Sequence, residues 1–318
     1  MSNQTDSHEQ TDKEIFSRLA FASLTEQRRA RRWNIFFKSL FAGYFLVLIF
    51  VLYLPEGSNS IADAKKTHTA IIDINGVISS ESEANADSII TSLRKAFEAE
   101  KAKAVILRIN SPGGSPVQAG YINDEIYRLK KKYPEKKVYA VIADMCASGG
   151  YYIAAAADEI YADKASVVGS IGVLMNGFGF VDAMKKVGVE RRLYTAGAHK
   201  GFLDPFSKAK PEDIKHIQGL LGNIHQQFID TVRKGRGDKL KENDKLYSGL
   251  VWTGEESIKI GLVDGLGSSS YVAREIVNAE NLVDYTLKPN FIDRFAERLG
   301  VSFGTAVTSK FLPNSYFQ

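Results

Sequence analysis

Strand patterns and helix patterns alternate along most of this 318-residue chain, and this alternation limits its fold more than any other feature. Runs rich in Val, Ile and Ala at 69–75, 104–110 and 137–143 have the composition of buried strands. Amphipathic helix patterns at 85–100 and 117–132 separate them. Parallel strands need crossover connections of this kind, so the sequence predicts an α/β fold with a mostly parallel sheet.

Shorter elements follow in the second half of the chain. The patterns predict apolar strand segments at 159–162 and 166–174, helices near 180–187 and 211–235, a strand at 190–195, a loop at 235–244, two short helices within 254–279 and an amphipathic helix at 290–299. With 44% hydrophobic and 25% charged residues, the composition is that of a globular protein.

An uncharged run from Ser39 to Leu54 sets the N-terminal region apart. Extended back to Trp33, with Lys38 as the one interruption, it reaches the ~20 residues that a helix needs to cross a bilayer. The Lys38 ammonium can snorkel to the interface. Arginines at 28, 29, 31 and 32 precede the run, and this bias predicts that the N-terminus is cytoplasmic and the rest of the chain lies outside.

We therefore predict a basic cytoplasmic tail at 1–32, a transmembrane signal anchor at 33–54 and a polar linker at 55–67. A cleaved signal peptide is the main alternative, because Ala62-Asp63-Ala64 resembles a cleavage site. The long segment before the apolar run, and the length of the run itself, favour an anchor that is not cleaved.

Charge and cysteine content argue against several other classes of protein. The net charge is only +4, and no basic stripe interleaved with aromatic residues suggests nucleic-acid binding. Cys146 is the single cysteine, so no intrachain disulfide can form, and the usual Cys/His zinc spacings are absent from the sequence. We expect no metal and no cofactor.

The most informative short segment is Asp144-Met-Cys-Ala-Ser-Gly-Gly-Tyr-Tyr-Ile-Ala154, where a strand pattern gives way to a helix pattern. Ser148 lies at this turn between small residues, so a substrate can approach its Oγ. The helix start also supplies amides that favour developing negative charge. Ser148 is therefore a candidate acyl-transfer nucleophile. On this segment alone, a simple N-cap role for Ser148 is equally compatible.

A second small-residue turn, Ser111-Pro-Gly-Gly-Ser115, follows the strand pattern at 104–110. Two glycines after a proline allow a sharp turn with exposed amides, and such amides can stabilise an oxyanion. Both turns follow strands of the same predicted sheet. Ligands bind at that edge in open parallel sheets, so the turns are expected to meet at one site.

A nucleophilic serine needs a base, and the histidines offer little support for a Ser–His–Asp triad. His8 and His68 lie in the tail and at the end of the linker, and His216 and His225 fall within the predicted helix at 211–235. No Gly-x-Ser-x-Gly motif surrounds Ser148. A Cys146 nucleophile is also disfavoured, because cysteines at strand ends are commonly small buried apolar residues.

The remaining candidate for the base is a lysine kept neutral by burial. Lys200 follows the predicted strand at 190–195, with apolar Phe202, Leu203 and Phe206 nearby to exclude water. His199 is its rival in the same segment. Further lysines at 208 and 210 lie in a segment that has the character of an exposed helix approach.

Four motifs together resemble the bacterial signal peptide peptidase A family. They are Asn-Ser-Pro-Gly-Gly at 110–114, Cys-Ala-Ser-Gly-Gly-Tyr-Tyr at 146–152, Gly-Ser-Ile-Gly-Val at 169–173 and Leu-Val-Asp at 262–264. Their order and spacing match that family over roughly residues 68–280. Its short form also carries an N-terminal membrane anchor.

The resemblance implies a Clp-protease/crotonase-like fold of repeated ββα units and a Ser–Lys serine protease. Ser148 corresponds to the nucleophile and Lys200 to the general base. The oxyanion hole corresponds to the amides of Gly114 and Ser148, with Gly149 and Ser170 as supporting residues. Ser170 corresponds to the serine that hydrogen-bonds the lysine.

On this reading, 68–284 is the protease domain and 285–318 a C-terminal tail. The resemblance further implies a homo-oligomer on the membrane, with the dyad shared between subunits. The chain would be a single-pass protein of the bacterial inner membrane with its catalytic domain in the periplasm. Its substrates would be cleaved signal peptides and other membrane-proximal unfolded peptides.

Two other functions fit the same fold. The segment Ala198-His199-Lys200-Gly201 departs from the family's usual Gly-Lys-Tyr-Lys, which leaves open a catalytically inactive, peptide-binding quality-control scaffold. A crotonase-type acyl-CoA enzyme is the other alternative. It is disfavoured because an exported domain meets little CoA.

Overall fold

The computed structural model describes residue 21, residues 25–48 and residues 66–287, and the chain divides into two compact units, Met1–Ser58 and Asn59–Gln318. In the first unit, residues 25–48 are helical. Residues 49–54 of the predicted anchor at 33–54 lie outside the described residues, as does the predicted helix at 290–299. Within the described ranges, no helix has both the length and the apolar character needed to cross a membrane.

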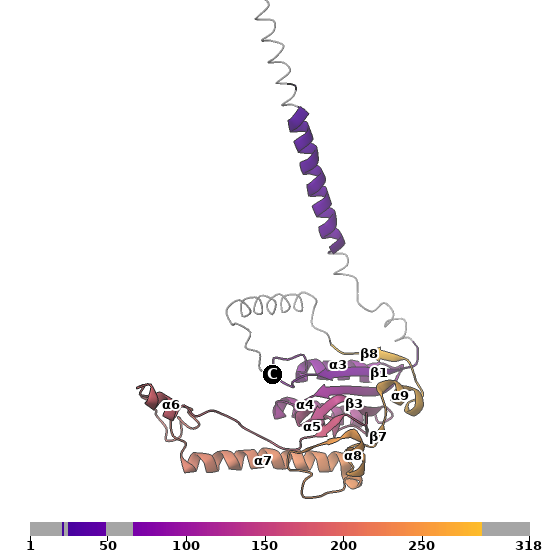
Figure 1. The fold of residues 1–318 in the computed structure, drawn as a ribbon. Coiled ribbons are helices and arrows are strands. Elements are labelled where there is room, and N and C mark those ends of the chain that lie inside the picture. Colours follow the sequence, from indigo (N-terminus) through magenta and orange to yellow (C-terminus); the bar gives the residue numbers. More distant parts are fainter. Residues whose placement is uncertain (1–20, 22–24, 49–65, 288–318) are drawn as a thin grey trace, which may run out of the picture. The chain divides into compact units, whose positions relative to one another are not determined.

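The second unit is built on one eight-stranded sheet, part of which is labelled in Figure 1. Its main path runs in the order β6-β5-β3-β2-β1-β8. The strands on that path are β1 (His68–Asn75), β2 (Ala102–Ser111), β3 (Lys137–Ala147), β5 (Val167–Gly169), β6 (Val251–Thr253) and β8 (Leu282–Asp284). Two further short strands, β4 (Glu159–Ala162) and β7 (Gly265–Leu266), extend it beside β3.

Parallel pairing in the centre of the sheet brings consecutive strands together. Ile71 of β1 pairs with Ile106 of β2, which in turn pairs with Tyr139 of β3. β3 is eleven residues long, so its first half pairs with β4 and its second half with β5. The one antiparallel pair among the described strands is β5 with β6. These pairings confirm the prediction of an α/β fold with a mostly parallel sheet.

Helices follow the strands in the predicted order. They are α3 (Ala86–Glu98), α4 (Pro116–Lys132), α5 (Gly149–Ala154), α6 (Val181–Lys186), α7 (Pro211–Arg236), α8 (Gly254–Lys259) and α9 (Ser269–Tyr271), with short turns η1 (Gly237–Lys239) and η2 (Val272–Ile276). Local capping starts several of them. Asn85 accepts a hydrogen bond from the Ser88 amide, and Ser115 caps α4 just before Pro116.

Both faces of the sheet are covered. One face packs against α3, α4 and α5 through a large cluster that includes Ile72, Leu107, Leu93 and Ile122. The other face packs Ile106 and its neighbours against Val272 and Ala273 of η2. Successive strand residues point to opposite faces, so strands buried on both sides need continuous apolar runs, as β2 has.

The predicted strand at 190–195 is wrong. The segment 189–200 is exposed and has no ladder partner among the described strands, and a strand without a neighbour leaves its backbone groups unpaired. The sequence did not predict β6, β7 and β8, which are only two or three residues each. Such short segments carry too little periodicity to predict a strand.

Candidate active site

Ser148 lies where β3 ends and α5 begins, in a backbone conformation that serine rarely adopts. Its φ is 51° and its ψ is −121°. Strained geometry of this kind costs on the order of 1–3 kcal/mol and persists only where the surroundings enforce it. Two backbone hydrogen bonds do so here: the Ser148 amide donates to Gly169 O at 2.8 Å, and the Tyr152 amide donates to Ser148 O at 3.0 Å.

The Ser148 hydroxyl does not cap α5, although the residue occupies the N-cap position. The simple capping role that the sequence left open is therefore not observed. The side chain is half-buried and lines a cavity instead. The strained turn thus presents the hydroxyl to a space that a ligand can enter, as an acyl-transfer nucleophile requires.

The second small-residue turn comes into direct contact with Ser148. A Cβ on Gly113 would lie 2.7 Å from the Ser148 Cβ and 2.7 Å from the Gly149 amide nitrogen. A short parallel bridge to Ile78 holds this turn, because Ile78 N donates to Gly113 O at 2.9 Å and Ser115 N donates to Ile78 O at 2.8 Å. The predicted meeting of the two turns at one sheet edge is confirmed.

We expect Gly113→Ala to disrupt this contact. Its φ of +100° is unfavourable for alanine, and the added methyl would overlap backbone as well as the Ser148 Cβ. Overpacking of this kind costs about 1–3 kcal/mol, so the free energy of unfolding should fall by that amount in chemical denaturation. Gly120→Ala in α4 is the matched control, because nothing lies within 4 Å of its Cβ. An unchanged stability in Gly113→Ala would contradict the tight packing of the two turns.

The amides available to an oxyanion differ from those expected. The Ser148 amide is occupied by Gly169 O, so its predicted role as an oxyanion donor is wrong. The Gly149 amide is the first of α5 and has no acceptor among the described residues, as is usual for the start of a helix. The Gly114 amide also lacks a described acceptor, and its nitrogen lies 3.2 Å from an ideal Cβ on Gly149. Gly114 and Gly149 therefore present adjacent free amides beside Ser148.

Ser148, Gly114 and Gly149 line a cavity of about 930 Å³. Ser170, which follows β5, also lines it and has a positive φ of 52°. The remaining walls come mostly from α4 and α7, and they are largely apolar: Pro112, Pro116, Val117, Tyr121, Tyr152, Val173, Leu174, Ile224 and Phe228. A mostly apolar cavity with a few convergent polar groups is typical of a ligand site.

Lys200 is not among the described residues that line this cavity. It lies on an exposed turn at 198–203, and two side-chain contacts attach that turn to α7. His199 Nδ1 is 3.0 Å from Asp213 Oδ1, and the Phe202 ring packs edge-on against His216. In Figure 1, α6 and the start of α7 lie away from the sheet. The structure thus separates the Lys200 turn from the serine that the sequence pairs with it.

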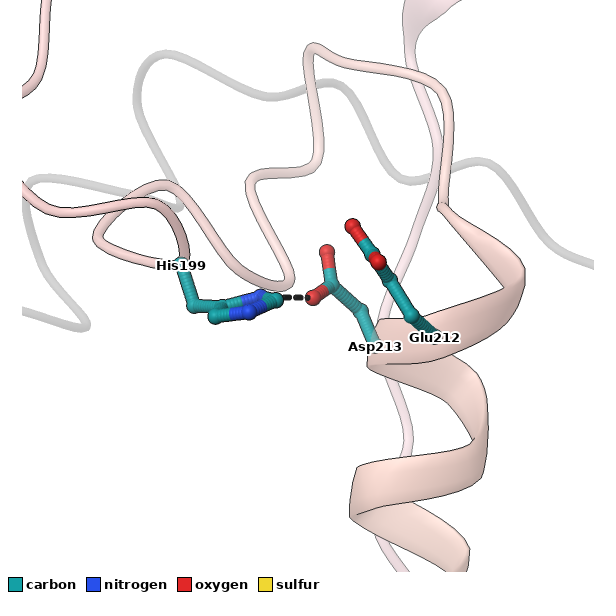
Figure 2. A group of neighbouring side chains, drawn as sticks. All are labelled: His199, Glu212 and Asp213. Atoms are coloured by element: carbon teal, nitrogen blue, oxygen red, sulfur yellow. Dashed lines mark hydrogen bonds and ion pairs between the residues drawn. The ribbon is translucent and has the colours of Figure 1, made fainter.

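Glu212 lies beside Asp213 at the start of α7, as Figure 2 shows. One donor atom from each of His199, Glu212 and Asp213 lies within 4.8 Å of the others, a spacing that a metal ion could use. The positively polarised start of α7 and the neighbouring lysines at 200 and 210 oppose a cation there. The hydrogen bond between His199 and Asp213 instead attaches the Lys200 turn to α7.

The other histidines that the structure describes form contacts outside the cavity. His225 Nε2 lies 3.2 Å from Ile171 O, and His68 stacks on Tyr285. No histidine in the described part of the chain lines the cavity. Cys146 is fully buried, and burial raises the pKa of its thiol well above the ordinary value, which suppresses the nucleophilic thiolate.

Comparison with known proteins places this site in a family. The sequence model of peptidase family S49 matches residues 130–283. A protein of Enterococcus faecium named as a signal peptide peptidase SppA is 31% identical over 245 residues, which are 73% of this chain and 71% of that protein. The chain belongs to peptidase family S49, the signal peptide peptidase A family. The family predicted from the four motifs is confirmed.

Two further relatives of this family S49 chain differ from it in length. Protease 4 of Haemophilus influenzae is 37% identical over 222 residues, 68% of this chain and 35% of that protein. A Brucella melitensis protein named Na(+)/H(+) antiporter NhaA is 51% identical over 175 residues, 55% of this chain and 24% of that protein. The chain spans about a quarter of the length of that relative, so the name describes a much longer protein.

Proposed function

We propose that this chain is a serine endopeptidase in which Ser148 is the nucleophile. The observation that carries the proposal is the strained Ser148 turn, whose hydroxyl faces a cavity beside the free amides of Gly114 and Gly149. In the proposed reaction, a neutral lysine amine takes the Ser148 proton, and Oγ attacks the peptide carbonyl. The two amides stabilise the oxyanion by ~3 kcal/mol per donor. The ammonium then protonates the leaving amine, and water hydrolyses the ester.

Lys200 is the proposed base, and we propose that a second copy of the chain supplies it. Lys200 is attached near Asp213 at the start of α7, whereas Ile224 and Phe228 of α7 line the Ser148 cavity. Asp213 and Ile224 are separated by about 16 Å along a helix with a rise of 1.5 Å per residue. Docking of a neighbour would also bury Lys200, and burial favours the neutral amine that a base requires. Ser170 would hydrogen-bond the incoming amine at the cavity wall.

Exposed apolar side chains in the segment 174–194, which precedes the Lys200 turn, support a homo-oligomer. Leu174, Phe178 and Tyr194 are 80%, 81% and 89% exposed, and Val187 is 73% exposed. Several such residues in one segment are unusual for a surface that faces water and indicate a protein-binding surface. A homo-oligomer that covers this segment would bury them and bring the Lys200 turn to another subunit's cavity.

The remaining parts of the proposal concern fold, substrate and location. The parallel sheet with its following helices is compatible with the Clp-protease/crotonase-like repeat, with 68–284 as the catalytic domain. The E. faecium relative's name suggests cleaved signal peptides as substrates, together with membrane-proximal unfolded peptides. The apolar run Ser39–Leu54 and the arginines before it support a single-pass inner-membrane anchor, a cytoplasmic N-terminus and a periplasmic catalytic domain.

The experiment that tests the proposal uses the full-length chain, a fluorogenic peptide with apolar residues and a serine-directed probe. We expect cleavage of the peptide and covalent labelling at Ser148, located by mass spectrometry, in the assembled state measured by sedimentation. A correctly assembled chain that neither cleaves nor takes the label would overturn the peptidase proposal. If it still binds peptides, that result would favour the inactive scaffold.

A further inference from the structure

One wall of the Ser148 cavity is a single face of α4. Val117, Gly120, Tyr121 and Asp124 line it, and their spacing of three and four residues places them on one side of the helix. The face begins next to Gly114, which lies just before α4 and presents a free amide beside Ser148. The face therefore leads away from the place where a peptide bond would be attacked.

Asp124 is the one charged side chain among the described residues that line the cavity. It is exposed, and its carboxylate forms no ion pair or hydrogen bond with the residues that the structure describes. Its neighbour Glu125 differs in both respects. Glu125 is buried away from the cavity and binds Arg94 Nε at 2.8 Å and Arg128 Nη2 at 2.6 Å. Asp124 thus contributes an uncompensated negative charge to a cavity lining whose other described residues carry no charged side chain.

The distance from Val117 to Asp124 along α4 indicates which residue of a bound peptide would lie beside the Asp124 carboxylate. Val117 and Asp124 are seven residues apart, which is about 10 Å at a rise of 1.5 Å per residue. An extended peptide advances about 3.3 Å per residue, so the same length is covered by three peptide residues. A lysine or arginine two to four residues from the attacked bond would bring its cation to Asp124, while apolar neighbours contact Val117 and Tyr121.

We propose that Asp124 makes this cavity selective for peptides in which a single basic residue lies within a few positions of an apolar cleavage segment. The proposal rests on the proposed peptidase function, since it names the substrate of that site. An exposed ion pair contributes modestly, so the expected preference is roughly three- to fivefold in affinity at low salt. Screening should reduce it as ionic strength rises.

Binding, measured separately from cleavage, tests this proposal. The full-length Ser148→Ala chain is titrated with fluorescent apolar peptides that carry one lysine, or the uncharged norleucine, at each position near the central bond. We expect at least one position where lysine binds three- to fivefold more tightly in 50 mM salt, and where Asp124→Asn, added to Ser148→Ala, removes the difference. Glu280→Gln is the matched control, because Glu280 is an exposed carboxylate that does not line the cavity.

Two results would overturn the proposal. One is equal affinity for lysine and norleucine at every position, or no binding of either peptide. The other is a lysine preference that persists in Asp124→Asn. Cleavage by the wild-type chain is measured beside these titrations, so a failed peptidase function appears as absent cleavage, whereas a failed Asp124 role appears as unchanged selectivity.

Discussion

Mixing Ser148→Ala and Lys200→Ala chains should restore about a quarter of wild-type peptidase activity, although each variant alone is inactive. Loss of the nucleophile or of the base is expected to lower kcat by about 10⁴-fold or more. In a closed homo-oligomer, each site would combine Ser148 of one subunit with Lys200 of its neighbour. After random reassembly of an equal mixture, half of the serines and half of the lysine partners are intact, which leaves both at about a quarter of the sites.

The measurement is the rate of peptide cleavage after the variants are dissociated, mixed and reassembled, with sedimentation as a check on assembly. The matched control is Lys200→Ala mixed with the double variant Ser148→Ala/Lys200→Ala, which has no intact lysine and should stay inactive. Inactive single variants without recovery in the mixture would contradict sharing between subunits. Activity that survives in Lys200→Ala would exclude Lys200 as the base and direct attention to His199.

Arg236→Ala should strongly destabilise the second unit. The Arg236 side chain is 1% exposed and binds Asp264 through two bonds, Nη1 to Oδ2 at 2.8 Å and Nη2 to Oδ1 at 3.0 Å. It also donates from Nε to Gly261 O at 2.8 Å. Arg236→Ala removes two charge-assisted bonds from Asp264 and the donor to Gly261 O, although Lys239 Nζ stays 2.8 Å from Asp264 Oδ1. Breaking a buried pair costs about 3–5 kcal/mol, and the remaining Lys239 contact places the expected loss near the lower end, about 3 kcal/mol.

Chemical denaturation of the wild-type and Arg236→Ala chains measures this loss. Arg274→Ala is the matched control, because the Arg274–Glu275 pair is about half exposed on both sides. Such exposed pairs contribute about 0–1 kcal/mol, so that variant should be nearly as stable as the wild type. Equal losses in the two variants would contradict a special role for the buried pair.

The same pair predicts a pH dependence of stability. Burial by itself raises the pKa of Asp264, but hydrogen bonds from Arg236 and Lys239 outweigh it and hold that pKa below its usual range. A carboxyl group with a lowered pKa in the folded state stabilises the protein above its unfolded pKa of ~3.9, and loses that contribution as the pH falls through the folded value. The stability gap between wild type and Asp264→Asn should therefore be full near pH 6 and shrink below about pH 4. A gap that is independent of pH would contradict this linkage.

The Asp264 pair also gives a physical reason for the Leu-Val-Asp motif. The motif helped to identify the family from the sequence, but the sequence did not indicate its role. Asp264 Oδ2 accepts from the Ile160 amide at 2.7 Å and from Arg236 Nη1 at 2.8 Å, and Lys239 Nζ lies 2.8 Å from the other carboxylate oxygen, Oδ1. Asp264 thereby connects β4, through Ile160, to the end of α7, through Arg236, although these elements are distant from one another in the sequence. The motif is structural in the described chain rather than part of the Ser148 cavity.

Local sequence determined the elements that depend on local physics. Continuous apolar runs define β1, β2 and β3, caps such as Ser115 start helices, and small residues mark the two turns that meet at Ser148. Neighbouring parallel strands end at the same sheet edge, so the meeting of the turns followed from topology alone. The family followed from four motifs whose joint order and spacing are specific.

Only the tertiary structure decided which groups the site can use. Whether an amide is free depends on distant acceptors, and Gly169 O takes the Ser148 amide while the Gly149 amide stays free. The segment at 190–195 has a strand-like pattern, but it has no neighbouring strand to pair with, and pairing makes a strand. Lys200 follows that segment, and its position is set by contacts with α7 that are remote in sequence. The residue types of the site were thus local information, whereas their hydrogen-bond partners and their placement depended on long-range packing.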